Sequence, residues 1–379
     1  MLAKSPNSAG LILVAAVSGR ALAQAARRAG YRVRVADFFG DDDTVAAAEK
    51  TALLPGSLRN GVDSGRTAAV LQELAEDAPS SPVEALILGS GFERLPDLVD
   101  QLADHFPLAG NRGNAIRRIK DPETLAADCA ELGMSHPEFS WVEPADPKNW
   151  ISKRVGGAGG VHVQSGQAGA RADDRYFQCR IDGQNISALF IADGRKAHVV
   201  GFSRQWTSPT MDAPFRYGGA VRLLRFDRDD AAMISGWLSD LTERAGLVGL
   251  CSADFIRSRD GHHLIEINPR PGATLDIFDT VQAPLIRAHI NACRGEAFQL
   301  PRFNDSKASL VAYTRRSLAA FPEINWPDWT ADRQASGSRL EPGDPVCTVF
   351  ADGRSAEQAK HAVYANLRQL EGAWGGGRP

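Results

Sequence analysis

The chain has 379 residues, a length that predicts two to three domains. Its composition, 43% apolar and 23% charged, is that of an ordinary globular protein. Its 43 Lys and Arg residues nearly balance 46 Asp and Glu residues, so the net charge is −3. This balance excludes a dedicated nucleic-acid-binding protein. The apolar run at 11–17 is far shorter than the ~20 residues of a membrane span, and five scattered cysteines favour reduced thiols in a cytoplasmic protein.

Residues 1–112 are predicted to form a parallel α/β domain, because short apolar segments alternate with amphipathic ones. The expected strands are 11–17, 33–36 and 83–88, and the expected helices are 20–29, 65–77 and 95–104. Ligands of such sheets bind at the carboxyl ends of the strands, where glycine-rich turns lie at 18–19 and 89–91. Glu93 follows the second turn and is a candidate substrate contact, with helix capping as the alternative.

From residue 113 the pattern changes to a helix at 114–133, followed by strand-rich sequence after Trp150. A helix at 228–245 precedes strands at 247–268, and a final helix is expected near 355–371. The expected division is a second domain at 113–300, with a separate lobe at about 150–200, and a small β-rich domain at 301–379. The predicted fold class is therefore mixed α/β.

The most informative segment is 249–272, which predicts a β-hairpin turning at Asp260-Gly261. A three-residue loop at 259–261 would place residue 258 opposite 262 and Asp254 opposite Glu266. Strand alternation then puts Asn268 on the same face as Glu266. The other face is apolar and suited to a core; it carries Ala253, Phe255, Ile265 and Ile267.

Two carboxylates held this close repel one another, which favours a divalent cation between them. Asp254, Glu266 and the amide oxygen of Asn268 are oxygen ligands that suit Mg²⁺ (or Mn²⁺) together with nucleotide phosphates. The alternative is a hairpin that exposes its charged face to water. The Pro-Arg-Pro-Gly exit at 269–272 favours a built site.

Lys153 and a loop of four glycines form a second motif, which indicates phosphate binding. A lysine at a strand end can contact phosphates, and glycines allow backbone N–H groups to approach them closely. The glycines are Gly156, Gly157, Gly159 and Gly160. The loop is not a Walker A motif, because no Gly-Lys-Ser/Thr follows it, and alone it is equally compatible with a flexible linker.

In this order the two motifs resemble the ATP-grasp superfamily over about residues 5–300. The resemblance implies that Lys153 contacts the α and β phosphates, that Asp254, Glu266 and Asn268 hold the metal, and that Arg270 stabilises the transferring phosphoryl group. It also implies an adenine-flanking strand, which comprises Tyr176, Phe177, Gln178 and Cys179. Relatives often carry a glutamate for the ribose, whereas this chain offers only Asp182.

The chain is also similar to biotin-carboxylase-related ligases in its tail and to predicted ligases linked to one-carbon (methanopterin or methylofuran) cofactor genes of methylotrophic bacteria. The resemblance implies an ATP-dependent ligase that joins a carboxylate and an amine through an acyl phosphate, releases ADP and phosphate, and serves cofactor biosynthesis. Alternatives are a carboxylase-like enzyme that activates bicarbonate and a nucleotide-binding protein without catalysis. Arg204, Tyr217 and Gly272 are further candidate substrate contacts, with loop packing equally open. No membrane or nucleic-acid partner is expected, and a homo-oligomer stays open.

Overall fold

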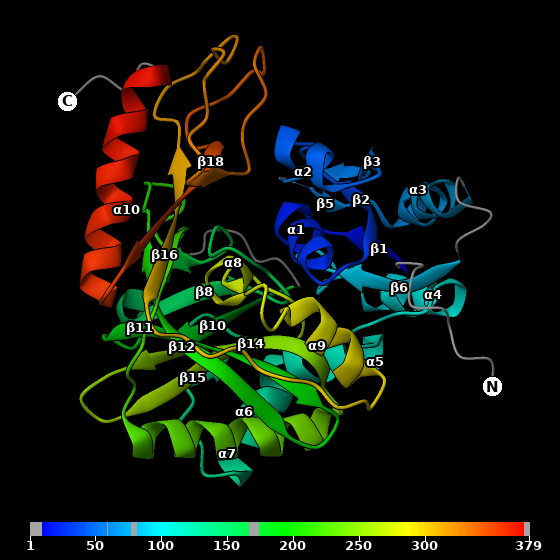
Figure 1. Ribbon diagram of the computed structural model, residues 1–379. Helices are drawn as coiled ribbons and strands as arrows, with labels where there is room; N and C mark the ends of the chain where they lie inside the picture. The colour runs from blue at the N-terminus through cyan, green and yellow to red at the C-terminus, as the bar shows by residue number, and fades with distance from the viewer. Residues whose placement is uncertain (1–9, 59, 77–81, 167–173, 375–379) are drawn as a thin grey trace.

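The computed structural model describes residues 10–58, 60–76, 82–166 and 174–374. Figure 1 shows an N-terminal α/β unit beside a larger central region, against which the C-terminal strands and helix stand. None of the helices in the described ranges is long and apolar enough to cross a membrane.

The N-terminal unit is built on a parallel four-stranded sheet in the order β3-β2-β1-β6. Its strands are β1 (Leu11–Ala15), β2 (Arg32–Asp37), β3 (Lys50–Leu53) and β6 (Val83–Leu88). Its helices are α1 (Arg20–Arg28), α2 (Asp42–Ala47), α3 (Ser64–Glu76) and α4 (Pro96–His105), and β4 (Gly56–Ser57) pairs with β5 (Gly61–Val62). β1 is apolar throughout because α1 covers one face of the sheet, while α3 and α4 cover the other. The predicted strand and helix alternation is confirmed, although residue 77 of the helix expected at 65–77 lies outside the described residues.

The single helix expected at 114–133 is two helices, so this expectation is wrong. α5 (Gly113–Lys120) ends just before Pro122, and α6 (Pro122–Glu131) begins there. Proline at the first helical position has no N–H to donate, and the Asp121 carboxylate accepts the Thr124 N–H at 2.8 Å as the N-cap of α6. The break places Lys120 at the end of α5.

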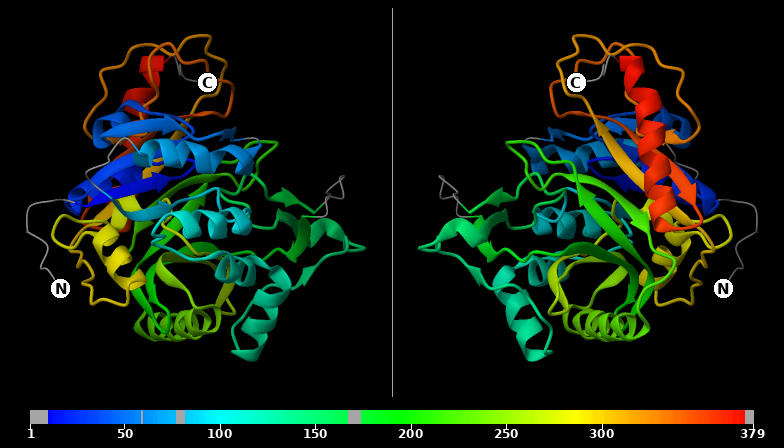
Figure 2. Two further views of the ribbon diagram at one scale, coloured as in Figure 1. Left: turned by 90° about the vertical axis from the view of Figure 1, so that its right-hand side faces the viewer. Right: turned by 90° about the vertical axis from the view of Figure 1, so that its left-hand side faces the viewer.

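A small antiparallel sheet, β7-β10-β8-β9, forms a separate lobe within the expected 150–200 segment and just before it. Its strands are β7 (Phe139–Ser140), β8 (Trp150–Arg154), β9 (Gln164–Ser165) and β10 (Arg175–Cys179), with the 3-10 turn η1 (Pro147–Asn149). Figure 2 shows this lobe projecting from the rest of the molecule. The part of the lobe at 167–173 lies outside the described residues.

An eight-stranded antiparallel sheet forms the body of the molecule, in the order β15-β14-β11-β12-β13-β16-β18-β17. Its strands are β11 (Gln184–Asp193), β12 (Ala197–Thr207), β13 (Tyr217–Arg222), β14 (Val248–Arg257), β15 (His262–Asn268), β16 (Ser306–Tyr313), β17 (Thr330–Ala331) and β18 (Pro345–Gly353). The strands of the expected 301–379 domain therefore continue the central sheet and do not form a sheet of their own.

Helices cover both faces of the large sheet. α7 (Arg228–Ala245) and α10 (Ala356–Glu371) pack on one face, with the short turn η2 (Gly372–Trp374) after α10. α8 (Leu275–Phe278) and α9 (Leu285–Cys293) pack on the other face and contact α1 of the N-terminal unit. The site-bearing end of the hairpin β14–β15 thus lies between the central sheet and the N-terminal unit.

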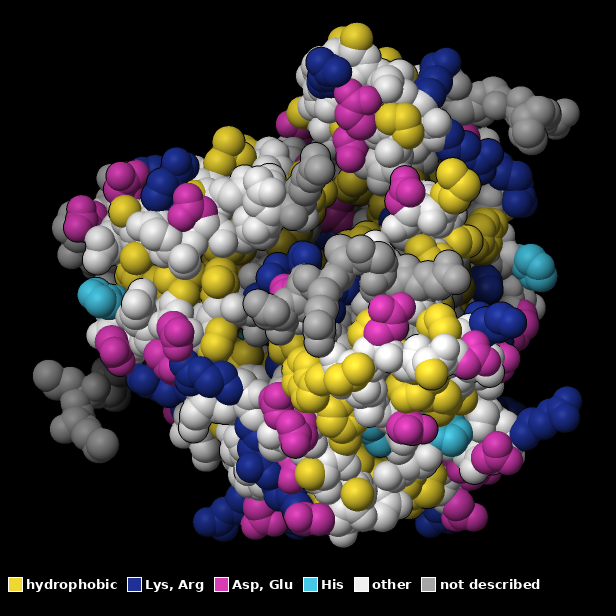
Figure 3. All heavy atoms as spheres, turned by 180° about the vertical axis from the view of Figure 1, so that it is seen from behind, with side chains coloured by type: hydrophobic (Ala, Val, Ile, Leu, Met, Phe, Trp, Pro, Cys, Tyr) yellow, Lys and Arg dark blue, Asp and Glu magenta, His cyan; other side chains and the backbone are white. Residues whose placement is uncertain are grey.

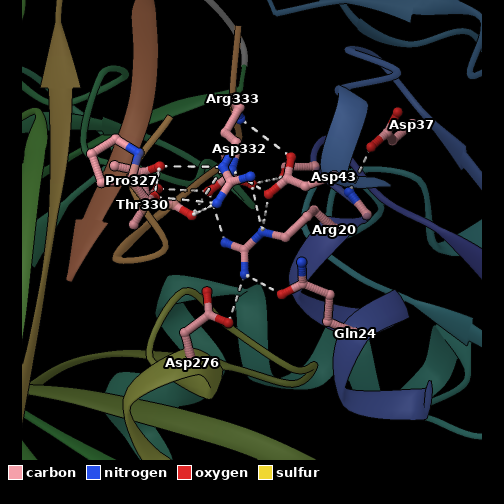
Figure 4. Close-up of polar contacts among 12 residues, drawn as sticks. Arg20, Gln24, Asp37, Asp43, Asp276, Pro327, Thr330, Asp332 and Arg333 are labelled. Atoms are coloured by element: carbon pink, nitrogen blue, oxygen red, sulfur yellow. Dashed lines mark hydrogen bonds and ion pairs between the residues drawn. The ribbon is translucent and has the colours of Figure 1, made fainter. Parts of the chain in front are cut away.

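A buried arginine joins the N-terminal, central and C-terminal regions (Figure 4). Arg20, only 2% exposed, contacts Asp276 of α8 at 2.7 Å and Asp332 after β17 at 2.8 Å. Its Nε also lies 4.0 Å from Asp43 of α2. We call these four residues the Arg20 junction. Asp43 additionally accepts the backbone N–H of Asp332 at 2.9 Å, so the junction ties the first α/β unit to the last strands.

Candidate functional site

The hairpin β14–β15 brings Asp254 directly opposite Glu266, as the sequence predicted. The route to this pairing differs from the expected one, because Arg257 pairs with His262 and the loop has four residues, 258–261. A register shift between Asp254 and Phe255 then leaves one extra residue, Ile265, on the β15 side. The expected pairing of 258 with 262 is therefore wrong, and the bulge restores the alignment of the two carboxylates.

Lys120 lies against this carboxylate pair, although the sequence analysis did not select it. Its Nζ donates to Glu266 Oε1 at 2.5 Å and to Asn268 Oδ1 at 2.9 Å. The Asn268 amide donates in turn to Asp254 Oδ2 at 3.1 Å, and Gln205 donates to Asp254 Oδ1 at 3.3 Å. The three predicted metal ligands, Asp254, Glu266 and Asn268, are thus gathered in one hydrogen-bonded group, which we call the hairpin group.

The two carboxylates differ in their electrostatic surroundings. Burial raises the pKa of Asp254, and the neighbouring charge of Glu266 raises it further. Burial would also raise the pKa of Glu266, but the charges of Lys120 and Lys153 outweigh it and lower that pKa to about 2. Glu266 is therefore ionised, and the repulsion between the pair falls mainly on Asp254.

Lys153 is almost fully buried, at 4% exposed, and lies near the end of β8 in the small lobe. Its Nζ donates to Gln178 Oε1 at 3.3 Å and to the Ile265 carbonyl at 3.2 Å. Ile265 is the bulged residue, which gives its carbonyl this partner outside the strand ladder. Burial would lower the pKa of the Lys153 ammonium, but Tyr176 and Glu266 together raise it.

The predicted glycine loop follows β8 and adopts backbone conformations that favour glycine. Gly156, Gly159 and Gly160 have φ of 66°, 71° and 72°. A Cβ on Gly157 would lie 2.4 Å from the ring of His162, so only glycine allows this approach. The glycines are therefore required by the loop itself, whatever it binds.

A pocket of about 20 Å³ lies between the small lobe and the central region. It is lined by residues of both parts, among them Lys120, Lys153, His136, His162, Tyr176 and Glu266. Burial, with the charge of Lys153, lowers the pKa of His136 to about 4. Burial likewise lowers the pKa of His162 to about 4, so both imidazoles are neutral at pH 7. At that pH the charged residues of the lining are therefore three cations, Lys120, Lys153 and Arg154, and one anion, Glu266.

Arg270 follows the hairpin and meets the N-terminal unit at Glu93. Its Nε donates to Glu93 Oε1 at 2.7 Å, and these two side chains are only 13% and 2% exposed. Among the described residues its terminal nitrogens make only long contacts, at 3.4 Å to the Pro271 carbonyl and 3.5 Å to Asn268 Oδ1. The outer edge of the guanidinium is thus weakly bound by the protein.

The remaining predicted residues are spread more widely. Arg204 precedes Gln205 on β12, so it lies on the opposite face of the sheet from Asp254. It pairs with Glu357 at 3.1 Å in a groove of about 500 Å³ beside α10. Gly272 lies beside Arg270, since a Cβ there would be 2.8 Å from its Nη1. The structure thus places Gly272 with the hairpin group and Arg204 away from it.

Tyr217 lies on β13. Burial raises the pKa of its phenol, and the charges of Asp254 and Asp276 raise it further. Asp182 stands in the loop after β10, where its 89% exposed side chain pairs with Arg180. Tyr176, Phe177 and Gln178 are buried within the small lobe, and Cys179 is half-buried at its edge. No direct contact joins Asp182 or Tyr217 to the carboxylate pair within the described residues.

The oxygen ligands fit a magnesium ion in their chemistry. Two opposed carboxylates and an amide oxygen are hard donors of the kind that Mg²⁺ prefers. Within the described residues no group of three or more His, Cys, Asp and Glu gathers at metal-binding spacing. Substrate phosphates and water would therefore have to complete the coordination.

Seen from behind, the molecule is hollowed where its regions meet, and both basic and acidic side chains are visible within the hollow (Figure 3). The contacts of Glu93 with Arg270 and of Lys120 with Glu266 join different elements of the fold. The arrangement can hold an anion against several cations while carboxylates remain close by.

Residues 122–274 match the family model described as an ATP-grasp domain. A search of curated protein sequences found no match. The structure is similar to an L-amino acid ligase from Bacillus licheniformis, with a TM-score of 0.68, 14% identity, and coverage of 96% of this chain and 97% of that one.

It is also similar to a biotin carboxylase from Campylobacter jejuni, with a TM-score of 0.69, 13% identity and coverage of 97% and 91%. An N5-carboxyaminoimidazole ribonucleotide synthetase from Thermotoga maritima gives a TM-score of 0.66, 12% identity and coverage of 95% and 98%. The chain therefore has the ATP-grasp fold, and the predicted fold class is confirmed.

Proposed function

We propose that this protein is an ATP-dependent ligase that activates a carboxylate as an acyl phosphate and transfers the acyl group to an amine. The observation that carries the proposal is the hairpin group. Asp254, Glu266 and Asn268 lie together at one point, and the cations Lys120 and Arg270 contact the same group. Carboxylates and cations so arranged can hold a metal and phosphates at once.

The cations would bind the nucleotide phosphates. Within the part of the chain that the structure describes, Lys153 is held by neutral oxygens of Gln178 and Ile265 and by the neighbouring phenol of Tyr176, so an incoming phosphate could take over its donors without breaking a direct ion pair. Lys120 is paired with Glu266 and would be free to contact a phosphate if a metal were held by that carboxylate. The buried strand with Tyr176, Phe177 and Gln178, ending at Cys179, would flank the adenine, and Asp182 would lie near the ribose.

Mg²⁺ would be held by Asp254, Glu266 and Asn268, and it would neutralise phosphate oxygens during transfer. The chain's own residues supply the rest. Arg270 offers two weakly engaged terminal nitrogens to the transferring phosphoryl group, and its planar fork suits two oxygens at once. A carboxylate is a poor electrophile until phosphorylated, after which the amine attacks the carbonyl and phosphate leaves.

The glycine loop at 156–160 would admit the nucleotide and then exclude water. The existing space of about 20 Å³ is too small for a nucleotide, so the small lobe and the central region must separate to admit one. Closure afterwards would protect the acyl phosphate from hydrolysis. Glycines with positive φ next to Lys153 give this loop the conformational range it needs.

Hydroxylamine trapping tests the proposal. With ATP, Mg²⁺ and a set of carboxylic acids but no amine, hydroxylamine should convert the acyl phosphate to a hydroxamate, with ADP and phosphate formed one for one. AMP and pyrophosphate would contradict the acyl-phosphate route. A product class linked to one-carbon cofactor biosynthesis is the finer form of this proposal, and the acids and amines of those cofactors are the first to try.

Bicarbonate activation is a second candidate, because a biotin carboxylase is as similar in structure as the L-amino acid ligase. Bicarbonate-dependent ADP release without any amine or organic acid would favour it. ATP binding without turnover, with organic acids or with bicarbonate, would instead support a non-catalytic nucleotide-binding protein.

A further inference from the structure

The loop after β6 connects the N-terminal unit to both sides of the site. Glu93 in this loop is 5% exposed, and its carboxylate bonds Arg270 through Oε1 at 2.7 Å. Its other oxygen, Oε2, accepts the Gly91 N–H at 2.8 Å. Gly91 has a φ of 107°, a conformation that favours glycine and turns its N–H back toward the carboxylate.

Both oxygens of Glu93 are therefore engaged within the protein. A carboxylate that contacted substrate would need an oxygen directed into the site. The pairing instead uses Nε of Arg270, the inner nitrogen of the guanidinium, and leaves the two terminal nitrogens with contacts of 3.4 Å and 3.5 Å. Glu93 thus fixes the guanidinium from behind while its outer edge stays open.

The same loop also contacts the glycine loop of the small lobe. A Cβ on Gly156 would lie 2.9 Å from the Glu93 carbonyl oxygen, so the two backbones touch. The next residue, Arg94, pairs with Asp174 at 2.8 Å, and Asp174 also lies 3.0 Å from Arg154 at the end of β8. Residues 93 and 94 therefore meet Arg270 on one side and the phosphate-binding lobe on the other.

We propose that Glu93 is a positioning residue that orients Arg270 toward the transferring phosphoryl group, and that its loop sets Arg270 relative to the glycine loop. This inference rests on the proposed function, since it assigns Glu93 a role in the same site. Misplacement of a catalytic group by about 1 Å can cost ~100-fold in rate, so a fixed guanidinium has a measurable effect. Glu93 itself does not touch the substrate.

A double-mutant cycle with Glu93→Gln and Arg270→Lys tests the assignment. Glu93→Gln should lower kcat by ~30–100-fold while KM for the acid changes by less than ~3-fold. In the Arg270→Lys background the same change should lower kcat by less than ~3-fold, because its effect passes through Arg270. A full additive loss in both backgrounds, or a rise in KM for the acid, would show direct substrate contact and overturn the proposal.

Glu84→Gln is the matched control. Glu84 also joins the N-terminal unit to the central region, through a 3.1 Å pair with Arg294, but it lies at the other end of β6. Unfolding in urea should be compared for both variants, and Glu93→Asp, which keeps the charge on a shorter side chain, serves if Glu93→Gln does not fold. Equal activity losses in Glu84→Gln and Glu93→Gln would mean that Glu93 is merely structural.

A binding measurement separates failure of this inference from failure of the proposed function. Calorimetry should compare a non-hydrolysable ATP analogue with ADP, both with Mg²⁺. If no acid supports turnover, the expected result still holds: Glu93→Gln and Arg270→Lys each reduce the preference for the analogue over ADP by ~5-fold or more, because the γ-phosphate contact is lost. An unchanged preference in Glu93→Gln alone would refute the positioning role.

Discussion

Two buried groups of charges, the hairpin group and the Arg20 junction, differ in how their ions are satisfied. Beside the hairpin group, Lys153 rests on the neutral oxygens of Gln178 and Ile265, while Lys120 and Arg270 are each paired with one carboxylate. In the Arg20 junction a single guanidinium has carboxylates on two sides, with a third at 4.0 Å (Figure 4). Cations held by neutral groups can accept an anionic ligand, whereas the junction's cation is already saturated.

The junction's carboxylates are also satisfied by other donors. Asp332 accepts Thr348 Oγ1 at 2.6 Å, and the two oxygens of Asp43 accept the backbone N–H groups of Asp332 and Arg333. Asp332 itself has a φ of 50°, an unusual conformation for a residue with a side chain. Burial and charge alone therefore do not mark a binding site. What distinguishes one is whether its cations are bound by neutral groups or by carboxylates.

The largest expected effect is on the junction. Arg20→Met removes its cation and leaves three carboxylates facing one another, so the free energy of unfolding should fall by ~3–5 kcal/mol. Urea unfolding measures this. Arg339→Met is the control, because its pair with Glu341 is 79% and 51% exposed and should contribute less than ~1 kcal/mol. A loss in Arg20→Met no larger than in the control would break the contrast between the two groups.

The next effect is on catalysis at the hairpin. Glu266→Gln keeps the shape but removes one charge from the proposed metal site, so turnover should fall by more than ~100-fold. The free energy of unfolding should fall as well, by ~2–3 kcal/mol, because a pKa lowered to about 2 means that the charge of Glu266 stabilises the folded state. Asp260→Asn, at the exposed turn of the same hairpin, should retain activity. Wild-type turnover in Glu266→Gln would remove the magnesium assignment.

The sequence predicted the carboxylate pair because its determinants are local. Asp254 and Glu266 lie in one hairpin whose turn carries Asp260-Gly261, and the apolar face of the strands follows the period of two. The loop was predicted one residue too short. The extra residue in β15, Ile265, compensates for the longer loop, so both arrangements place Asp254 opposite Glu266. His262, the first residue of β15, is 3% exposed and pairs with Asp230 at 2.9 Å, a long-range contact that the hairpin pattern does not indicate.

Long-range partners were beyond the sequence. Lys120 and Glu266 are 146 residues apart, and Arg20 and Asp332 are 312 apart. Neither spacing nor periodicity links such positions, although the Asp121-Pro122 pair did carry the signal that ends α5 at Lys120. Glu93 is a candidate from the sequence because it follows a glycine turn. Its partner Arg270 is evident only in the folded structure, where the N-terminal unit meets the central region.

Nucleotide binding sharpens the description of the hairpin group as ligand-ready. Lys153→Ala should weaken ATP binding by ~10–100-fold and adenosine binding by less than ~2-fold, because a charge-assisted contact with phosphate is removed. Equilibrium binding of both ligands measures the difference. Lys196→Ala, at an exposed loop position, should change neither. Equal losses for ATP and adenosine would make Lys153 a structural residue.

The smallest effect concerns Asp41, the carboxylate next to the junction that has no direct partner. It is 6% exposed, and its side chain makes no hydrogen bond or ion pair among the described residues. Burial raises its pKa to about 8, and the charges of Asp332, Asp37 and Asp43 add to this. The folded protein therefore keeps this proton between about pH 4 and 8, whereas the unfolded chain, with a pKa near ~3.9, releases it.

Because the folded state binds the extra proton, stability must fall as the pH rises through this window. Asp41→Asn removes that dependence, so its free energy of unfolding should exceed that of the wild type by ~1–2 kcal/mol more at pH 6 than at pH 5. Urea unfolding at the two pH values gives the comparison. Asp42→Asn, one residue along and exposed, should show a difference that does not grow with pH. A parallel pH dependence in wild type and Asp41→Asn would mean that Asp41 is ionised in the folded protein and that a cation reaches it, which would make the junction a binding site after all.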